Sequence, residues 1–190
     1  MAQLSLPFAD LPGLLYEPNF LTPSEEMAIV EFVSAQGHWM PFGTRKRRLI
    51  YGFSYAVSSR RIEGRGLPIP PLLEAVALRL RDAGLIEAAA EQVVVQDYPP
   101  GIGIGRHIDS TAFGPGVVTL SLLSACIMRF RNIARPSQRV DQVLERRSAL
   151  AIRGAARIEW THEILPRSVV ARRLSIAFRT VAREPDVLSP

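Results

Sequence analysis

One stretch, residues 92–109 (QVVVQDYPPGIGIGRHID), constrains the possible folds of the chain more than any other. A β-branched run leads to Tyr98, a Pro-Pro-Gly turn follows, and the stretch ends at His107-Ile108-Asp109. In an extended segment, residues i and i+2 point to the same face, with Cα atoms about 6.6 Å apart. His107 and Asp109 are therefore placed to bind one metal ion together.

The third ligand of such an ion has few candidates, because the chain contains 3 histidines. Besides His107 they are His38 and His162, and several expected strands separate His162 from His107. Two histidines and one carboxylate form the facial triad that holds Fe(II) and leaves open coordination positions. A structural zinc site usually recruits cysteine, and this chain has 1 cysteine, Cys126. The alternative for each histidine is an ordinary hydrogen-bonded residue of the core or surface.

A late segment, RLSIAFR at 173–179, carries two arginines on one face of an expected strand. Strand alternation groups Arg173, Ser175, Ala177 and Arg179 on that face. The three intervening residues are apolar, so their face is expected to pack on a core. Two cations separated by small residues form a slot suited to a short dicarboxylate, held by charge-assisted hydrogen bonds. The alternative is a pair of surface arginines on an edge strand.

The first half of the chain predicts two helices. Thr22 is the expected N-cap of the first, with Pro23 at N1 and Glu25 closing a capping box. This helix should end near Gly37, with an apolar stripe of Ala28, Phe32 and Ala35 flanked by Met27, Val30 and Val33. The second helix, about 71–83, has Leu73, Val76, Ala77 and Leu80 on one face and stops at Gly84.

The second half changes to strand periodicity. Short strand-like runs occur at 93–95, 117–122, 127–131, 149–153 and 174–180. Helices early and strands late predict an α+β chain whose second half is a β-sandwich or barrel. A length of 190 residues suits one domain with a substantial core.

The segment 39–55 joins four consecutive cations to several aromatic residues. Trp39, Tyr51 and Tyr55 are candidates to stack on a nucleic-acid base beside these cations. The alternative is a solvated charged hairpin whose aromatic residues belong to the core. Residues 58–71, which follow, are expected to form a polar loop.

Bulk composition limits the partners of the chain. Its net charge of +5 permits a nucleic-acid partner without requiring one. A single cysteine, in an apolar run, fits a reducing compartment and a buried thiol. The N-terminal residues lack a secretory signal pattern, and no apolar run is long enough to span a membrane. We therefore expect a cytoplasmic protein with no membrane partner, and a monomer.

The combination of H-I-D, the later W-T-H and R-x5-R resembles the AlkB family of Fe(II)- and 2-oxoglutarate-dependent dioxygenases. The similarity also includes PGLLYEPNFLT, RRLIYGFSY, QDYPPGIGIGRHID, VTLSLLS and RRSALAIRGAARIEWTH, and so covers most of the chain. It implies a double-stranded β-helix (jelly-roll) core over about 91–182. Residues of about 12–90 would supply supporting helices and a nucleotide-recognition lid, all within one domain.

The resemblance also implies a role for individual residues. By position, His107, Asp109 and His162 would be the catalytic iron ligands. Arg179 would bind the 2-oxoglutarate carboxylate near the metal, and Arg173 with Tyr98 the distal carboxylate, with Ser175 beside them. The family usually has asparagine where this chain has Gln96, which keeps the amide and adds a methylene.

The implied reaction uses Fe(II), 2-oxoglutarate and O2 to oxidise a C–H bond, releasing succinate and CO2. If the carbon is an N-methyl group of a base, formaldehyde and the repaired base follow. An alkylated base in DNA or RNA, single-stranded or flipped out of a duplex, is then the substrate. The alternatives are hydroxylation of a tRNA modification or a protein side chain, and a non-catalytic nucleic-acid-binding module.

Overall fold

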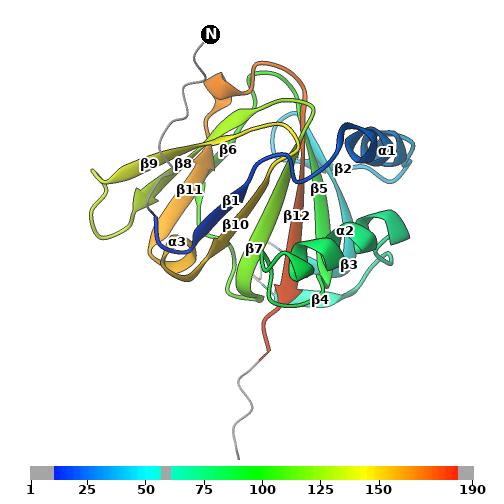
Figure 1. The fold of residues 1–190 in the computed structure, drawn as a ribbon, viewed down its shortest axis with the longest axis horizontal. Helices are drawn as coiled ribbons and strands as arrows, with labels where there is room; N and C mark the ends of the chain where they lie inside the picture. The colour runs from blue at the N-terminus through cyan, green and yellow to red at the C-terminus, as the bar shows by residue number, and fades with distance from the viewer. Residues whose placement is uncertain (1–10, 57–60, 184–190) are drawn as a thin grey trace, which may run out of the picture.

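The computed structural model describes residues 11–56 and 61–183, and these residues form two antiparallel sheets and two main helices (Figure 1). The helices are α1 (Pro23–Ser34), α2 (Pro71–Asp82), α3 (Gly154–Ile158) and a 3-10 turn (Pro166–Ser168). The strands are β1 (Leu14–Glu17), β2 (Met40–Phe42), β3 (Lys46–Ala56), β4 (Arg61–Arg65), β5 (Gln92–Tyr98), β6 (Ile104–His107), β7 (Phe113–Leu122), β8 (Cys126–Asn132), β9 (Arg139–Leu144), β10 (Ala149–Arg153), β11 (Trp160–Ile164) and β12 (Arg173–Val181).

The larger sheet has 8 strands in the order β1-β10-β7-β12-β5-β3-β2, with β4 paired to β3. The smaller sheet has 4 strands in the order β6-β11-β8-β9. Every pairing between these strands is antiparallel. This is the jelly-roll core expected from the sequence, and all five predicted strand runs are confirmed. The first half of the chain contributes more strand than expected, because β1 pairs with β10 and β3 with β5.

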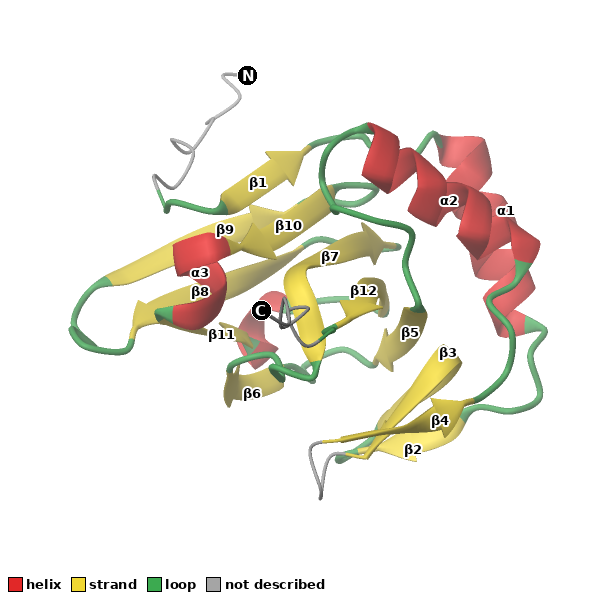
Figure 2. Cartoon of the chain, turned by 90° about the horizontal axis from the view of Figure 1, so that it is seen from below, coloured by secondary structure: helices red, strands yellow, loops and turns green. Residues whose placement is uncertain are grey.

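Two apolar cores hold the layers together. One lies between the large sheet and the helices, and Figure 2 shows α1 and α2 side by side outside that sheet. The other lies between the two sheets, where Leu150 and Ile152 of the large sheet pack with Met128, Phe130 and Ile164 of the small one. Neighbouring residues of β10 therefore serve different cores, as strand alternation requires.

The start of α1 is built as the sequence predicts. The Thr22 hydroxyl accepts a hydrogen bond from the Glu25 amide, and the Glu25 carboxylate accepts one from the Thr22 amide. The predicted apolar stripe of this helix was partly wrong: Val30, Phe32 and Val33 do pack on the core, but the stripe omitted the fully buried Ile29. Ile29 and Val33 are its buried apolar residues, whereas Ala28 and Ala35 are exposed, and the helix ends at Ser34 rather than near Gly37.

Helix α2 agrees with its predicted face. Leu73, Val76, Ala77 and Leu80 are all buried. Gly84 follows the helix with φ of +68°, a left-handed conformation that favours glycine at a helix end.

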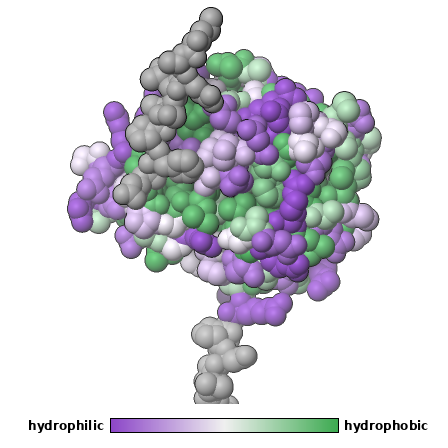
Figure 3. All heavy atoms as spheres, in the orientation of Figure 1, coloured by the Kyte–Doolittle hydropathy of each residue, from purple (hydrophilic) through white to green (hydrophobic). Residues whose placement is uncertain are grey.

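The segments around 39–71 are more regular than expected. Much of 39–55 lies in β2 and β3, and β3 extends the large sheet. The predicted loop at 58–71 instead contains β4, while its first three residues lie outside the described residues. Across the face shown in Figure 3, hydrophilic side chains alternate with apolar ones. Within the described ranges, no helix has both the length and the apolar character needed to cross a membrane.

Candidate metal and co-substrate site

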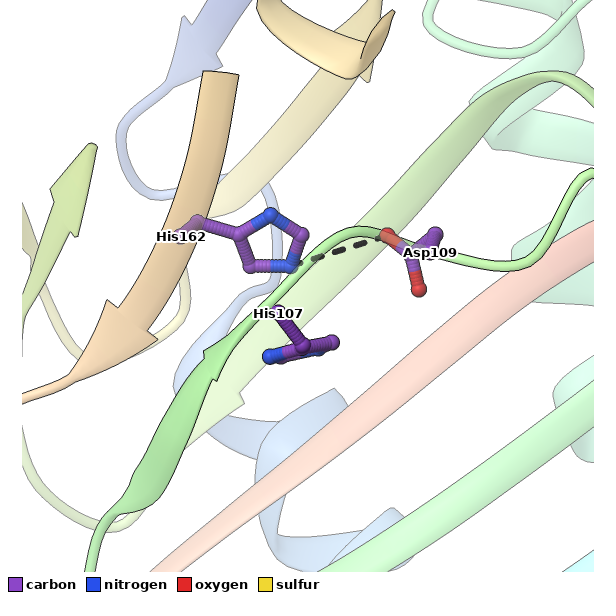
Figure 4. A group of neighbouring side chains, drawn as sticks. All are labelled: His107, Asp109 and His162. Carbon is purple, nitrogen blue, oxygen red and sulfur yellow. Dashed lines mark ion pairs between the residues drawn. The ribbon is translucent and has the colours of Figure 1, made fainter. Parts of the chain in front are cut away.

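His107, Asp109 and His162 come together at one end of the sandwich. Their candidate ligand atoms all lie within 4.8 Å of one another. His107 ends β6, Asp109 follows in the loop, and His162 lies opposite His107 on the adjacent strand β11 (Figure 4). The expectation that His107 and Asp109 come together is confirmed, although Asp109 lies in the loop after β6 and not in the strand, and strand pairing supplies the third group.

The imidazoles are prepared for metal binding. His107 Nδ1 lies 2.8 Å from the Gly105 carbonyl, and donating its proton there leaves Nε2 with a free lone pair. Burial lowers the pKa of His162 to about 4, so that this ring is neutral at pH 7. A neutral imidazole is the form that ligates a metal ion.

Asp109 supplies the negative charge of the cluster. Its Oδ1 lies 3.1 Å from Arg179 Nη2, and its Oδ2 lies 3.6 Å from His162 Nε2. Burial raises the pKa of Asp109, but the charge of Arg179, followed by those of the two histidines and Arg157, outweighs burial and lowers it. The carboxylate is therefore ionised, as a ligand of a divalent cation must be.

The loop before His107 is held tightly in place. A Cβ atom at Gly103 would lie 2.1 Å from the Ile164 carbonyl oxygen of β11, so no larger residue fits. The Lys46 ammonium, on the other side, donates a hydrogen bond of 2.9 Å to the Gly103 carbonyl. These contacts fix the approach of β6 to β11, and hence of His107 to His162.

Arg173 is the most unusual buried residue of the protein. It is 1% exposed, and its Nη2 donates a hydrogen bond of 2.9 Å to Ser121 Oγ. Its Nε and Nη1 are buried without partners among the described residues. A buried guanidinium with two unused donors is costly unless an anion completes it. A carboxylate fits this position, because its two oxygens match the guanidinium fork.

One pocket joins the arginines to the metal-binding cluster. Its lining is Gln96, Tyr98, Ile104, His107, Asp109, Val117, Thr119, Met128, Ile152, His162, Ile164, Arg173, Ser175, Ala177 and Arg179. All four residues predicted to share a face of β12 are among them. A dicarboxylate held in this pocket would reach Arg173 at one end and the metal-binding cluster at the other, the orientation that a bidentate co-substrate requires.

Tyr98 and Gln96 form the floor of this pocket on β5. Burial raises the pKa of Tyr98, which keeps the phenol protonated and able to donate a hydrogen bond. In the structure its hydroxyl donates to Gln96 Oε1. The strand register places Tyr98 opposite Arg173 and Gln96 opposite Ser175, so the longer Gln96 side chain still faces the pocket.

The three aromatic candidates lie in different places. Tyr51 is 3% exposed within the core under the helices, and Trp39 packs against the same core while its Nε1 donates to the Val33 carbonyl. Tyr55 lies in a second groove, which also reaches His107 and Asp109. Only Tyr55 of the three therefore faces the cluster.

Arg157 belongs to none of the motifs identified in the sequence. Its Nε donates to the Gly114 carbonyl at 3.1 Å, and its Nη2 donates to the Ser110 and Phe113 carbonyls. Its Nη1 lies 4.0 Å from Asp109 Oδ2. Arg157 thus anchors the loop that follows Asp109, through contacts between segments more than forty residues apart.

Comparison with known proteins agrees with this site. A sequence model described as the 2OG-Fe(II) oxygenase superfamily matches residues 13–179. An Arabidopsis thaliana protein named "Alkylated DNA repair protein ALKBH8 homolog" is 30% identical, over 93% of this chain and 60% of that protein. The Mus musculus tRNA (carboxymethyluridine(34)-5-O)-methyltransferase ALKBH8 is 30% identical, over 88% of this chain and 26% of that protein. The chain thus spans less than two thirds of these relatives.

This chain covers a larger share of other similar proteins. The Mus musculus alpha-ketoglutarate-dependent dioxygenase alkB homolog 4 is 27% identical, over 91% of this chain and 69% of that protein. The structure of OsALKBH1 superposes with a TM-score of 0.73 at 16% identity, covering 90% of this chain and 97% of that one. A Pseudomonas putida prolyl-4-hydroxylase superposes with a TM-score of 0.61 at 18% identity, covering 90% and 93%. The last two similarities concern the fold alone.

The chain belongs to the 2OG-Fe(II) oxygenase superfamily and, within it, to the AlkB family. The resemblance stated from the sequence motifs is thereby confirmed. Proteins of this superfamily use Fe(II), 2-oxoglutarate and O2, and the His-Asp-His cluster with the buried Arg173 fits such a set of ligands. Bound Fe(II) would activate O2, the oxidant of the reaction, and O2 would oxidise both 2-oxoglutarate, to succinate and CO2, and a substrate C–H bond.

Proposed function

We propose that this protein oxidatively dealkylates N-alkylated bases of DNA or RNA, releasing formaldehyde from N-methyl groups. The observation that carries the proposal is the second groove, which opens onto His107 and Asp109. Aromatic and cationic side chains line it, among them Tyr55, Phe113 and Arg48. Aromatic faces stack on bases, and arginines bind phosphates, so this lining suits a single nucleotide.

The residues of the site have separate proposed roles in binding iron and 2-oxoglutarate. His107, Asp109 and His162 are the proposed iron ligands, and Arg173 with Tyr98 binds the distal carboxylate of 2-oxoglutarate. Arg179 holds the Asp109 carboxylate in place and lies beside the near carboxylate. The cluster is buried on the protein side and open along the groove, so that a base entering from the groove meets it first.

The geometry of the groove also bears on the form of the substrate. A base stacked inside a duplex cannot reach the metal-binding cluster within this groove. We therefore expect the enzyme to act on single-stranded nucleic acid or on a base flipped out of a duplex.

The test is an incubation of the protein with methylated single-stranded oligonucleotides, Fe(II), 2-oxoglutarate and O2. Formaldehyde and the repaired base should form together with succinate, in equal amounts. The control is the same oligonucleotide without the methyl group. Succinate formation that is unaffected by the methylated oligonucleotides, with no formaldehyde released, would contradict the proposal.

A second candidate is hydroxylation of a modified base in tRNA. It is supported by the two ALKBH8-named relatives, one of which is named as a tRNA-modifying enzyme. The same assay separates the candidates. Succinate formation stimulated by tRNA, and not by methylated DNA, would favour the second; stimulation by protein alone would indicate a side-chain hydroxylase.

A further inference from the structure

The groove above the metal-binding cluster contains an arginine with no assigned task, Arg48 of β3. The strand register places Arg48 opposite Gln96 of β5, and Gln96 opposite Ser175 of β12. The three side chains thus form a row across the inner face of the large sheet. Arg48 lines the groove together with His107 and Asp109.

Arg48 differs from neighbouring arginines because no carboxylate neutralises it. No acidic group of the described residues lies within 4.0 Å of its guanidinium, and its Nε is buried without a hydrogen-bond partner. The adjacent Arg47, on the opposite face, pairs with Asp97 at 2.9 Å, and Arg172 pairs with the same carboxylate at 3.0 Å. The Arg48 guanidinium stacks on the Phe42 ring, with 4.8 Å from guanidinium carbon to ring centroid.

A second cation adds to this unbalanced charge. Arg48 and Arg179 line the same groove, and burial, and secondly the charge of Arg179, lower the pKa of Arg48. Asp109, the carboxylate that lines this groove, already pairs with Arg179. This side of the groove therefore has an excess of positive charge in a partly desolvated place, which an anion would relieve.

We propose that Arg48 forms an anion subsite for the substrate, binding an oxyanion that the substrate carries close to its reacting carbon. This inference rests on the proposed action on nucleic acid and deepens it. Two groups of a nucleotide supply such an oxyanion, namely the backbone phosphate and an acidic substituent of the base. Arginine binds either through two parallel hydrogen bonds.

The co-substrate is not the anion in question. Arg173 and Arg179 lie on β12, and β5 separates β12 from β3. At about 4.8 Å between neighbouring strands, the backbone of Arg48 is roughly 10 Å from that of Ser175, which is level with it, and farther from those of Arg173 and Arg179. Tyr55 and Phe113, with ring centroids 5.1 Å apart, line the same groove and offer an aromatic surface for a base. Aromatic surface and cation together match one nucleotide.

The experiment measures oligonucleotide binding by protein loaded with Mn(II) and 2-oxoglutarate, at several salt concentrations. Arg48→Met should weaken binding of a fluorescent single-stranded oligonucleotide about tenfold. It should also reduce the slope of log affinity against log salt by about 0.7, the value for one phosphate contact. Arg48→Lys should restore part of both. Thermal unfolding of each variant verifies the fold.

The matched control is Arg65→Met. Arg65 also lies over a phenylalanine, 5.0 Å from the Phe53 ring centroid, but it is exposed and does not line the groove. Its loss removes the same charge from the protein and should change affinity less than twofold. Equal losses in the Arg48 and Arg65 variants would overturn the subsite, because only the net charge would then matter.

A neutral methylphosphonate in the oligonucleotide identifies the source of the anion. If the backbone phosphate binds Arg48, this replacement at the target nucleotide weakens the wild type and not Arg48→Met. If the base supplies the anion, Arg48→Met binds an oligonucleotide with a carboxylated base more weakly than the wild type does, and binds other oligonucleotides equally well. The inference is overturned if wild type and Arg48→Met respond alike to the methylphosphonate and to the carboxylated base. It is also overturned if Arg48→Met loses tenfold in affinity for 2-oxoglutarate, measured by calorimetry.

Failure of the proposed function gives a different result. If the wild type binds no oligonucleotide, action on nucleic acid is contradicted, and inorganic phosphate then becomes the probe. Phosphate that raises the melting temperature of the wild type and Arg65→Met, but not of Arg48→Met, supports the anion subsite. Equal stabilisation of all three overturns it.

Discussion

The two faces of β12 are almost equally buried and chemically opposite. Leu174, Ile176 and Phe178 are 0% exposed and pack in the core beneath the helices. Arg173 and Ser175 are 1% and 4% exposed and line the pocket on the other side. The first face is complete in the protein alone. The second retains buried guanidinium donors with no partner among the described residues, so burial by itself does not distinguish a stabilising residue from a functional one.

This difference predicts that substitutions on the two sides will separate stability from turnover. The strongest test lies on the pocket side. His107→Ala should reduce 2-oxoglutarate turnover about 100-fold or more, because it removes a proposed metal ligand. Thermal unfolding of the metal-free variant should match that of the wild type. The exposed neighbour Arg106 provides the control, Arg106→Ala, and unchanged turnover in His107→Ala would refute the metal assignment.

On the helix-covered face, Phe178→Ala should lower the free energy of unfolding by about 3–5 kcal/mol, because it leaves a cavity in a closed core. Denaturant unfolding measures this loss. Turnover per folded molecule, at a temperature where the variant stays folded, should remain near that of the wild type. A loss of unfolding free energy below about 1 kcal/mol would show that the core closes around the missing side chain. The two faces of β12 would then not differ as described.

Arg173→Met tests the opposite face of the same strand. The variant should raise the KM for 2-oxoglutarate about 10- to 100-fold, since hydrogen bonds to a charged group are lost. Its metal-free form should be as stable as the wild type or more so, because a buried, incompletely paired charge is replaced by an apolar chain. Arg172→Met, next to it but paired with Asp97 outside the pocket, should leave the KM unchanged.

The smallest effect is expected far from both faces, at the start of α1. Ion pairing with Arg79, together with hydrogen bonds from Thr22, lowers the pKa of Glu25 from 4.5 to about 2. A lowered pKa stabilises the fold fully above pH 4.5, and this contribution is lost as the pH falls through about 2. Glu25→Gln should therefore lower stability at pH 6 by less than about 1 kcal/mol, and the difference should shrink in acid.

Local signals allowed much of this structure to be predicted. The capping box at Thr22 and Glu25 depends on residues three apart, and the stripe of α2 repeats along one helix, so both were confirmed. The alternation in RLSIAFR sorted the two faces of β12 correctly. Each of these patterns is decided within a single element.

The remaining features depend on contacts between distant segments. The apolar residues around α1 allowed more than one stripe, and packing against the sheet selected Ile29 and Val33. Tyr51 read equally well as a stacking residue or a core residue, because pairing of β3 with β5 decides which face is covered. Arg157 carries no local pattern at all, and Arg48 stood out only as one of four consecutive cations; the surroundings of both became visible only in the assembled sheets.

The strand order of the large sheet has a consequence for folding. β12 lies between β7 and β5, although it is the last strand of the described chain. During synthesis, therefore, the centre of this sheet stays open until residues 173–181 have left the ribosome. Pairing across such long sequence separations is slow and leaves unpaired strand edges exposed. We expect the nascent chain to depend on chaperones until β12 inserts, and the pocket to be among the last parts of the molecule to form.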